Sequence, residues 1–359
     1  MNQGLALYRA AAVEPTSGQM TATGGDPGPA EKPCSRLSYV DAAKGIAVIL
    51  VVLWHAVGDR LLIFEALVYL RMPLFFFAAG LFAQRGLDAR WKDFLPVRVG
   101  QIFWLYLLWV PIVYYMTTGA TEMVRSDLSL EEGLEPATML IDPPNTLWFL
   151  YALGLMYLGA KLVRPFNWQI VLGASFAAYA VVISGWFTFR HDLLEMLCRL
   201  AALAPFFLIA SYHSQIIRTF IQDWAHWALR GLAAYFFIAV AIVAFDGGFN
   251  PLATFSASII GVASLLMLLY RHSTSITVRT LNKLGRQSLF VFVLHRIPLY
   301  YYNLFLAEVG MQNDVLALTV GGLAIVVGCW ALGEHVLSRY ARWTMEAPWL
   351  TKHRVRASS

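Results

Sequence analysis

Residues that could do acid–base chemistry stand in one apolar stretch, "AKGIAVILVVLWHAVGDR", which runs from Ala43 to Arg60. His55 lies eleven residues after Lys44, and Asp59 lies four residues after His55. Because an α-helix turns about 100° and rises about 1.5 Å per residue, all three share one stripe, with Lys44 and His55 about 16 Å apart. An imidazole can take the proton of a hydroxyl that attacks a carbonyl carbon. We therefore predict that His55 is a catalytic base and that Asp59 orients its ring.

The rest of this stripe decides between a functional and a structural role for His55. A single buried histidine is often a structural residue, but Asp41 lies on the same face as the three residues above. Ionisable side chains inside a membrane are costly and usually face a cavity or a partner. Four of them on one stripe therefore favour a functional site.

The composition indicates that a membrane surrounds this stripe. Of the 359 residues, 58% are hydrophobic and 14% are charged, whereas soluble domains have about 45–50% apolar and about 25% charged residues. Ten segments approach the length of about 20 residues that a hydrocarbon core of about 30 Å requires. They cover residues 43–63, 66–83, 99–117, 146–163, 169–188, 194–211, 230–246, 252–270, 287–307 and 315–336. We predict an all-α fold, a polytopic transmembrane helical bundle of about ten spans.

The distribution of basic residues predicts the orientation of the bundle. If the N-terminus is cytoplasmic, all but six of the 27 Lys and Arg residues fall on the cytoplasmic side, as the positive-inside rule requires. The six others are Arg60, Arg71, Arg125, Arg190, Arg199 and Arg296. Both termini are therefore predicted to be cytoplasmic, with the acidic loop 118–145 outside. The same pattern accounts for the net charge of +5 without a nucleic-acid partner.

We expect one membrane domain between two tails. Residues 1–36 contain "TATGGDPGPAEKPCS", which is rich in Gly, Pro and small polar residues, so we predict a disordered cytoplasmic tail. Residues 37–337 hold the spans, and residues 338–359 form a basic cytoplasmic tail. The sequence indicates no metal site, because Cys34, Cys198 and Cys329 lack metal-ligand spacing.

Four motifs follow one another along these spans. The first is a basic residue separated from a histidine by ten residues, here Lys44 and His55. "RMPLFFFAAGLF" (Arg71–Phe82) stands in the second span, "NTLWFLYAL" (Asn145–Leu153) opens the fourth, and "LGRQSLFVFVLHRIPLYYY" (Leu284–Tyr302) fills the ninth. Together they resemble the motifs of the acyltransferase-3 family of integral membrane O-acyltransferases. The resemblance is greatest to the branch related to fucose 4-O-acetylase and other stand-alone sugar acetylases.

The resemblance implies roles for further residues. Donor-binding residues would be Lys44, Arg98 and Gln101, although the family often has a second arginine where Gln101 stands. Arg71 replaces the histidine that close relatives often show before Met-Pro-Leu. The acceptor-binding or site-lining residues would be Arg71, Trp148, Ser288, His295 and Tyr302. The last three are spaced by seven and are expected to share a helix face, whereas Trp148 also fits an interfacial aromatic belt.

The resemblance implies an O-acyltransferase that moves an acyl group, with acetyl expected, from cytoplasmic acyl-CoA to a hydroxyl. The acceptor would be a sugar, a glycolipid or a surface or exported polysaccharide, and acyl-CoA would be a substrate rather than a resident cofactor. Acylation of a small natural product is an alternative. A proton-coupled transporter or exporter that uses His55 and Asp59 is another. The expected location is a bacterial cytoplasmic (inner) membrane, where a multi-pass chain contacts lipid.

Overall fold

The computed structural model describes residues 37–119, 147–185, 192–245 and 250–350, and these residues form helices and no strands. The all-α prediction is confirmed. The predicted disordered tail 1–36, nearly all of the acidic loop 118–145 and the last nine residues of the basic tail lie outside the described residues.

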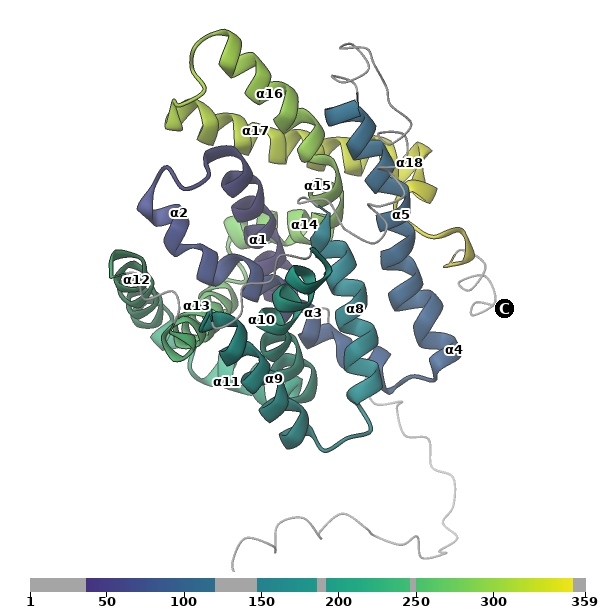
Figure 1. Ribbon diagram of the computed structural model, residues 1–359, viewed down its shortest axis with the longest axis vertical. Helices are drawn as coiled ribbons and strands as arrows, with labels where there is room; N and C mark the ends of the chain where they lie inside the picture. The colour runs from purple at the N-terminus through teal and green to yellow at the C-terminus, as the bar shows by residue number, and fades with distance from the viewer. Residues whose placement is uncertain (1–36, 120–146, 186–191, 246–249, 351–359) are drawn as a thin grey trace, which may run out of the picture. The chain divides into compact units, whose positions relative to one another are not determined.

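The described helices follow one another from the first membrane segment to the C-terminal part of the chain (Figure 1). The first group is α1 (Ser38–Val57), α2 (Leu62–Ala66), α3 (Val68–Asp88), α4 (Trp91–Phe94), η1 (Leu95–Gly100), α5 (Gln101–Tyr114) and η2 (Tyr115–Gly119). The second is α8 (Trp148–Val163), α9 (Trp168–Ile183), α10 (Asp192–Tyr212), α11 (Ser214–Asp223), η4 (Ala225–Trp227), α12 (Ala228–Ala244) and α13 (Pro251–Arg271). The last is α14 (Ile276–Arg286), α15 (Ser288–Leu294), α16 (Arg296–Glu308), α17 (Val315–Leu332), η6 (Gly333–Leu337), α18 (Ser338–Tyr340) and η7 (Arg342–Thr344).

Each of the ten predicted spans falls on a helix, but they differ in their ability to cross a bilayer. Within the described residues, seven helices are long and apolar enough to span a membrane, and the bent pair α15–α16 makes an eighth if it counts as one span. The other two, α8 and α9, have 16 residues each. Such a helix is about 24 Å long, which is shorter than a hydrocarbon core of about 30 Å.

Helix α1 lies among α3, α13, α14 and α17 (Figure 1). Its closest approach to another helix uses two glycines. A Cβ atom on Gly285 of α14 would lie 1.6 Å from the carbonyl oxygen of Asp41, and a Cβ on Gly45 would lie 2.4 Å from that of Leu281. Side chains larger than hydrogen therefore do not fit where α1 and α14 cross. The first glycine belongs to the "LGRQS" motif, so the structure explains that glycine as a packing requirement.

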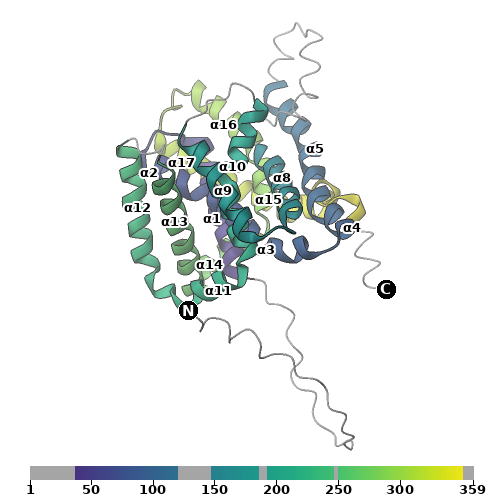
Figure 2. The same cartoon turned by 60° about the horizontal axis from the view of Figure 1, so that its bottom comes forward.

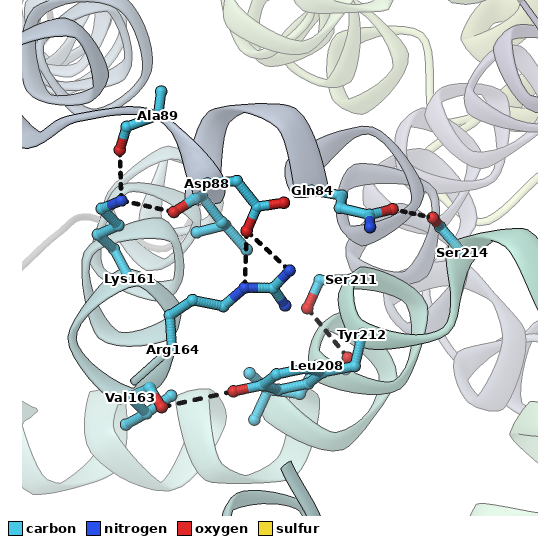
Figure 3. Close-up of polar contacts among 11 residues, drawn as sticks. Gln84, Asp88, Ala89, Lys161, Val163, Arg164, Leu208, Ser211, Tyr212 and Ser214 are labelled. Carbon is cyan, nitrogen blue, oxygen red and sulfur yellow. Dashed lines mark hydrogen bonds and ion pairs between the residues drawn. The ribbon is translucent and has the colours of Figure 1, made fainter. Parts of the chain in front are cut away.

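Helix α3 packs on α10 by the same means, while α12 and α13 lie side by side at another edge of the bundle (Figure 2). A Cβ atom on Gly80 would lie 2.4 Å from the carbonyl oxygen of Phe207. Polar contacts then fix the C-terminal end of α3 against α8 and the start of α11 (Figure 3). Arg164 forms a 2.8 Å ion pair with Asp88, and Ser214 donates a hydrogen bond to Gln84.

Lys161 caps the C-terminal end of α3 in the same polar cluster. Its ammonium group donates hydrogen bonds to the carbonyl oxygens of Leu87 and Ala89 (Figure 3). Carbonyl groups at a helix C-terminus lack partners within the helix and carry partial negative charge, so a lysine is well placed there. These contacts explain Lys161 and Arg164 as structural cations.

Candidate active site

The position of His55 follows from the way α1 ends. Gly58 terminates the helix with a φ of 68°, a left-handed conformation that favours glycine, and its N–H donates to the Trp54 carbonyl oxygen at 2.8 Å. His55 therefore lies in the last turn of α1 and is half-buried. No residue within the described ranges makes a hydrogen bond with its ring, so both ring nitrogens are available to a substrate.

His295 lies at a break in the ninth predicted span. The span predicted over residues 287–307 is bent, because α15 ends at Leu294 and α16 continues at an angle of 48°. Pro298, four residues after Leu294, has no N–H for the Leu294 carbonyl, which favours a bend at this point. The shared face predicted for Ser288, His295 and Tyr302 is therefore interrupted at its middle member.

Two backbone carbonyl oxygens at the bend determine which nitrogen of the His295 ring carries the proton. Nδ1 lies 3.1 Å from the carbonyl oxygen of Val291 and 2.8 Å from that of Phe292. Because carbonyl oxygens only accept, these contacts assign the ring proton to Nδ1, and the neutral ring then carries its lone pair on Nε2. The Nε2 atom is buried and has no hydrogen-bond partner in the described part of the chain. It is thus an acceptor in a fixed orientation.

The two histidines are brought together although they are far apart in the sequence. The rings of His55 and His295 stack with centroids 5.4 Å apart and an interplanar angle of 29°. This contact places two imidazoles within reach of one substrate. One of them, His295, is held by backbone, and the other is free to exchange protons at either nitrogen.

Three of the sequence motifs meet in an aromatic wall beside His295. The ring centroid of Phe292 lies 6.0 Å from that of His295, and the ring centroid of Phe149 lies 4.9 Å from that of Phe292. The ring centroid of Phe75 in turn lies 5.0 Å from that of Phe149. All three phenylalanines are buried. The "MPLFFF" and "TLWFL" motifs therefore provide an apolar, water-excluding boundary to the histidine pair, a role that their separate positions in the sequence did not indicate.

Two arginines flank the histidine pair. The guanidinium carbon of Arg71 lies 4.5 Å from the ring centroid of Trp54, the residue before His55. Arg296 directly follows His295, and both arginines interact electrostatically with His55. The sequence predicted Arg71 as site-lining, and the structure adds Trp54 as the ring that supports it. A tryptophan directly before a histidine in an apolar span is the signal that could have suggested this residue.

Asp59 and Lys44 are not in contact with the histidine pair. Asp59 is exposed beyond Gly58, and within the described residues no hydrogen bond joins it to His55. Lys44 forms a 3.1 Å ion pair with the buried Asp41, and its ammonium group lies 4.2 Å from the centroid of the Phe82 ring. The i,i+3 spacing of Asp41 and Lys44 would have allowed this pair to be predicted.

Arg98 and Gln101 lie near the C-terminal part of the chain. Arg98 packs over Gly86, where an added Cβ would come within 3.0 Å of its Nε atom. The Gln101 amide donates to the Met345 carbonyl at 2.7 Å and accepts from the Ala347 N–H at 2.8 Å. Gln101 is therefore a backbone partner of the segment 343–349.

Three tryptophans bind the same segment to α5 and η1, where the C-terminal elements lie beside α5 (Figures 1 and 2). Trp104 and Trp109 donate to the carbonyl oxygens of Trp343 and Thr344 at 3.0 and 2.9 Å. Trp349 donates to the Pro96 carbonyl at 3.0 Å. Residues 343–349 are thus attached along the helix that carries Gln101, a contact that the sequence did not indicate.

The remaining predicted site residues make other contacts. The guanidinium carbon of Arg199 lies 5.3 Å from the ring centroid of Trp148, and Arg199 also forms an ion pair with Glu195. Tyr302 donates to the Ala317 carbonyl at 2.8 Å and holds α16 against α17. Ser288 is half-buried at the first position of α15. Among the described residues, no group of three or more His, Cys, Asp or Glu could hold a metal ion.

Comparison with known proteins agrees with this arrangement of motifs. The family described as an acyltransferase domain, acyltransferase-3, matches residues 37–334. The chain belongs to the acyltransferase-3 family. The matched range begins with α1 and ends in η6, so it contains both histidines and both flanking arginines, but not residues 343–349.

One curated relative also matches the chain. The inner membrane protein YcfT of Escherichia coli (strain K12) is 22% identical over 302 residues, covering 74% of this chain and 80% of the relative. No solved structure matches the chain. The protein is a multi-pass membrane acyltransferase of this family, and the relative's name places that relative in the inner membrane.

Proposed function

We propose that this acyltransferase moves an acyl group, acetyl in the simplest case, from cytoplasmic acyl-CoA to a hydroxyl of a sugar, a glycolipid or a surface polysaccharide. The observation that carries this proposal is the stack of His55 on His295. It provides one unbonded imidazole and one fixed acceptor nitrogen behind an aromatic wall. These are the groups that removal of a hydroxyl proton in a water-poor site requires.

The proposed reaction is a direct transfer. The acceptor hydroxyl oxygen forms a bond to the thioester carbonyl carbon while His55 takes its proton. The tetrahedral intermediate then breaks its carbon–sulfur bond, and the proton on His55 passes to the departing CoA thiolate. The lone pair on His295 Nε2 accepts a hydrogen bond from a substrate O–H or N–H and so orients that substrate.

The donor would approach from the side where Lys44 and Arg98 lie. Both are on the predicted cytoplasmic side, and Lys44 is about 16 Å below His55 along α1. Cations at such an entrance attract a donor that carries phosphates. In this arrangement the thioester reaches the histidine pair from below, and the acceptor reaches it from the outer end of α1.

The transporter alternative has less support. It needs a chain of proton-carrying groups that includes Asp59, yet in the described residues no hydrogen bond links Asp59 to His55. Acylation of a small natural product instead of a glycan uses the same chemistry at His55. The acceptor class therefore has to be determined by experiment.

The proposed function is tested by mass spectrometry of surface glycans and small secreted products from a deletion strain. We expect one of these products to lose an acyl group, to regain it with the wild-type gene, and not to regain it with His55→Ala. If no product loses an acyl group and the purified chain transfers no label from acetyl-CoA, the proposed function is wrong.

A further inference from the structure

Arg71 and Arg296 are half-buried cations with no anionic partner among the described residues. Neither makes a hydrogen bond or an ion pair within the residues that the structure describes. Arg71 contacts the face of the Trp54 ring, an interaction that uses none of its five N–H donors. Both act electrostatically on His55, and no ion pair with Asp or Glu is formed by either of them within the described residues. The surroundings of the catalytic histidine are therefore positively charged and rich in unused donors.

Three other half-buried cations in the described residues pair with a carboxylate, whereas Lys161 and Arg218 donate to backbone carbonyl oxygens. Lys44 pairs with Asp41, Arg164 with Asp88 and Arg199 with Glu195. The pairing has a physical reason, because removing a charge from water costs free energy unless an opposite charge compensates it. Arg164 is the closest comparison, since its guanidinium group also lies over an aromatic ring, that of Tyr212, at 4.9 Å. The guanidinium group of Arg71 lies over the Trp54 ring in the same way. Unlike Arg164, however, Arg71 has no carboxylate partner in the described residues.

The reacting groups of the proposed transfer do not supply this anion. A thioester and a hydroxyl are both uncharged, and the tetrahedral intermediate has one negative charge, which the proton taken up by His55 balances. Two arginines would then remain uncompensated through the whole reaction. A guanidinium group pairs best with a carboxylate or a phosphate, which it can bind through two parallel hydrogen bonds.

We propose that the acceptor is an anion, with a carboxylate or phosphate group close to the hydroxyl that is acylated, and that Arg71 and Arg296 bind this group. This inference rests on the proposed function, because it names the chemical class of the acceptor at the same site. Uronic acids and sugar phosphates have this chemistry, and neutral glycans do not. Arg71 and Arg296 are thus acceptor-binding residues that hold the hydroxyl next to His55.

A protection experiment tests the binding site without knowledge of the acceptor. The full chain in lipid nanodiscs is treated with phenylglyoxal, which modifies accessible guanidinium groups, and modified peptides are quantified by mass spectrometry. Glucuronate, inorganic phosphate and glucose are the probes. We expect glucuronate or phosphate to slow modification of Arg71 and Arg296 at least about fivefold, and glucose to have no effect. Arg164, which already has Asp88, is the matched control and should not respond to any probe.

The outcomes separate the two anion classes. Protection by glucuronate alone indicates a carboxylate acceptor, and protection by phosphate alone indicates a phosphorylated one. Equal protection by glucose, or no protection by either anion, would overturn the inference. Loss of glucuronate or phosphate binding in Arg71→Gln, with partial binding in Arg71→Lys, would support it further.

Analysis of the acylated product separates this inference from the proposed function. If the deletion strain loses an acyl group from an acidic sugar or a phosphorylated unit, both stand. If the acyl group is lost from a neutral unit, the enzyme is an acyltransferase and the anionic-acceptor inference is wrong. If no acyl group is lost from any product, the proposed function itself fails.

Discussion

The imidazole of His55, in the last turn of α1, stacks on the imidazole of His295, with ring centroids 5.4 Å apart. The two residues belong to the first and ninth predicted spans. Their contact depends on the crossing of α1 and α14 at Gly45 and Gly285 and on the bend at His295. The site is therefore a product of helix packing, and residues far from the chemistry should affect it.

Replacing His55 by alanine should abolish acyl transfer while the protein still inserts and accumulates. Loss of a general base costs about 10²- to 10⁴-fold in rate. The measurement is transfer of label from acetyl-CoA to membrane glycans, normalised to protein amount. His226→Ala, at an exposed position of η4, is the control and should behave like wild type. Wild-type activity in His55→Ala would leave His55 as a packing residue.

Replacing His295 by asparagine separates its two ring nitrogens. The Asn amide can still donate to the Val291 and Phe292 carbonyls, but it has no atom at the Nε2 position. We expect the thermal stability to stay near that of wild type and the rate to fall about tenfold, the value of a hydrogen bond of about 1.4 kcal/mol. Unchanged activity would show that the Nε2 lone pair is not used.

Exchanging Gly285 for alanine should destabilise the bundle. Its new Cβ would meet the Asp41 carbonyl at 1.6 Å, and overpacking of this kind costs about 1–3 kcal/mol or more. The measurement is thermal unfolding in detergent. Gly159→Ala is the matched control, because an added Cβ there meets no atom within 4 Å. Equal stability of the two variants would mean that α1 and α14 can move apart at no cost.

The sequence predicted what depends on local geometry and missed what depends on packing. The stripe of Lys44 and His55 follows from helix periodicity alone, and both residues lie on α1 as expected. The pairing of His55 with His295 is not encoded locally, because it depends on the crossing of α1 and α14, which are distant in the sequence, and on the bend at His295. The helix face that Ser288 and Tyr302 were predicted to share is interrupted, because the helix bends between them. The apolar content of α8 and α9 predicted membrane spans, but with 16 residues each these helices are shorter than the thickness of a hydrocarbon core.

Replacing Gln101 by leucine should loosen the C-terminal segment. The change removes the hydrogen bonds to the Met345 carbonyl and from the Ala347 N–H, worth about 1 kcal/mol each. Hydrogen–deuterium exchange at the Ala347 amide should therefore become faster. Gln222→Leu, at an exposed position of α11, is the control and should leave this exchange unchanged. Unchanged exchange in Gln101→Leu would mean that the three tryptophans hold the segment without help.

Lys44 can be tested for a donor-binding role apart from its structural one. Lys44→Met removes the 3.1 Å partner of the buried Asp41, which should cost about 1–3 kcal/mol of stability. Adding Asp41→Asn removes the carboxylate charge that Lys44 had paired with and should restore part of that loss. If Lys44 also attracts acyl-CoA, the apparent KM for acetyl-CoA should stay several-fold above that of Asp41→Asn alone, even when stability is restored. Equal KM values in the double variant and in Asp41→Asn would assign Lys44 to the ion pair and leave the donor-binding role to Arg98.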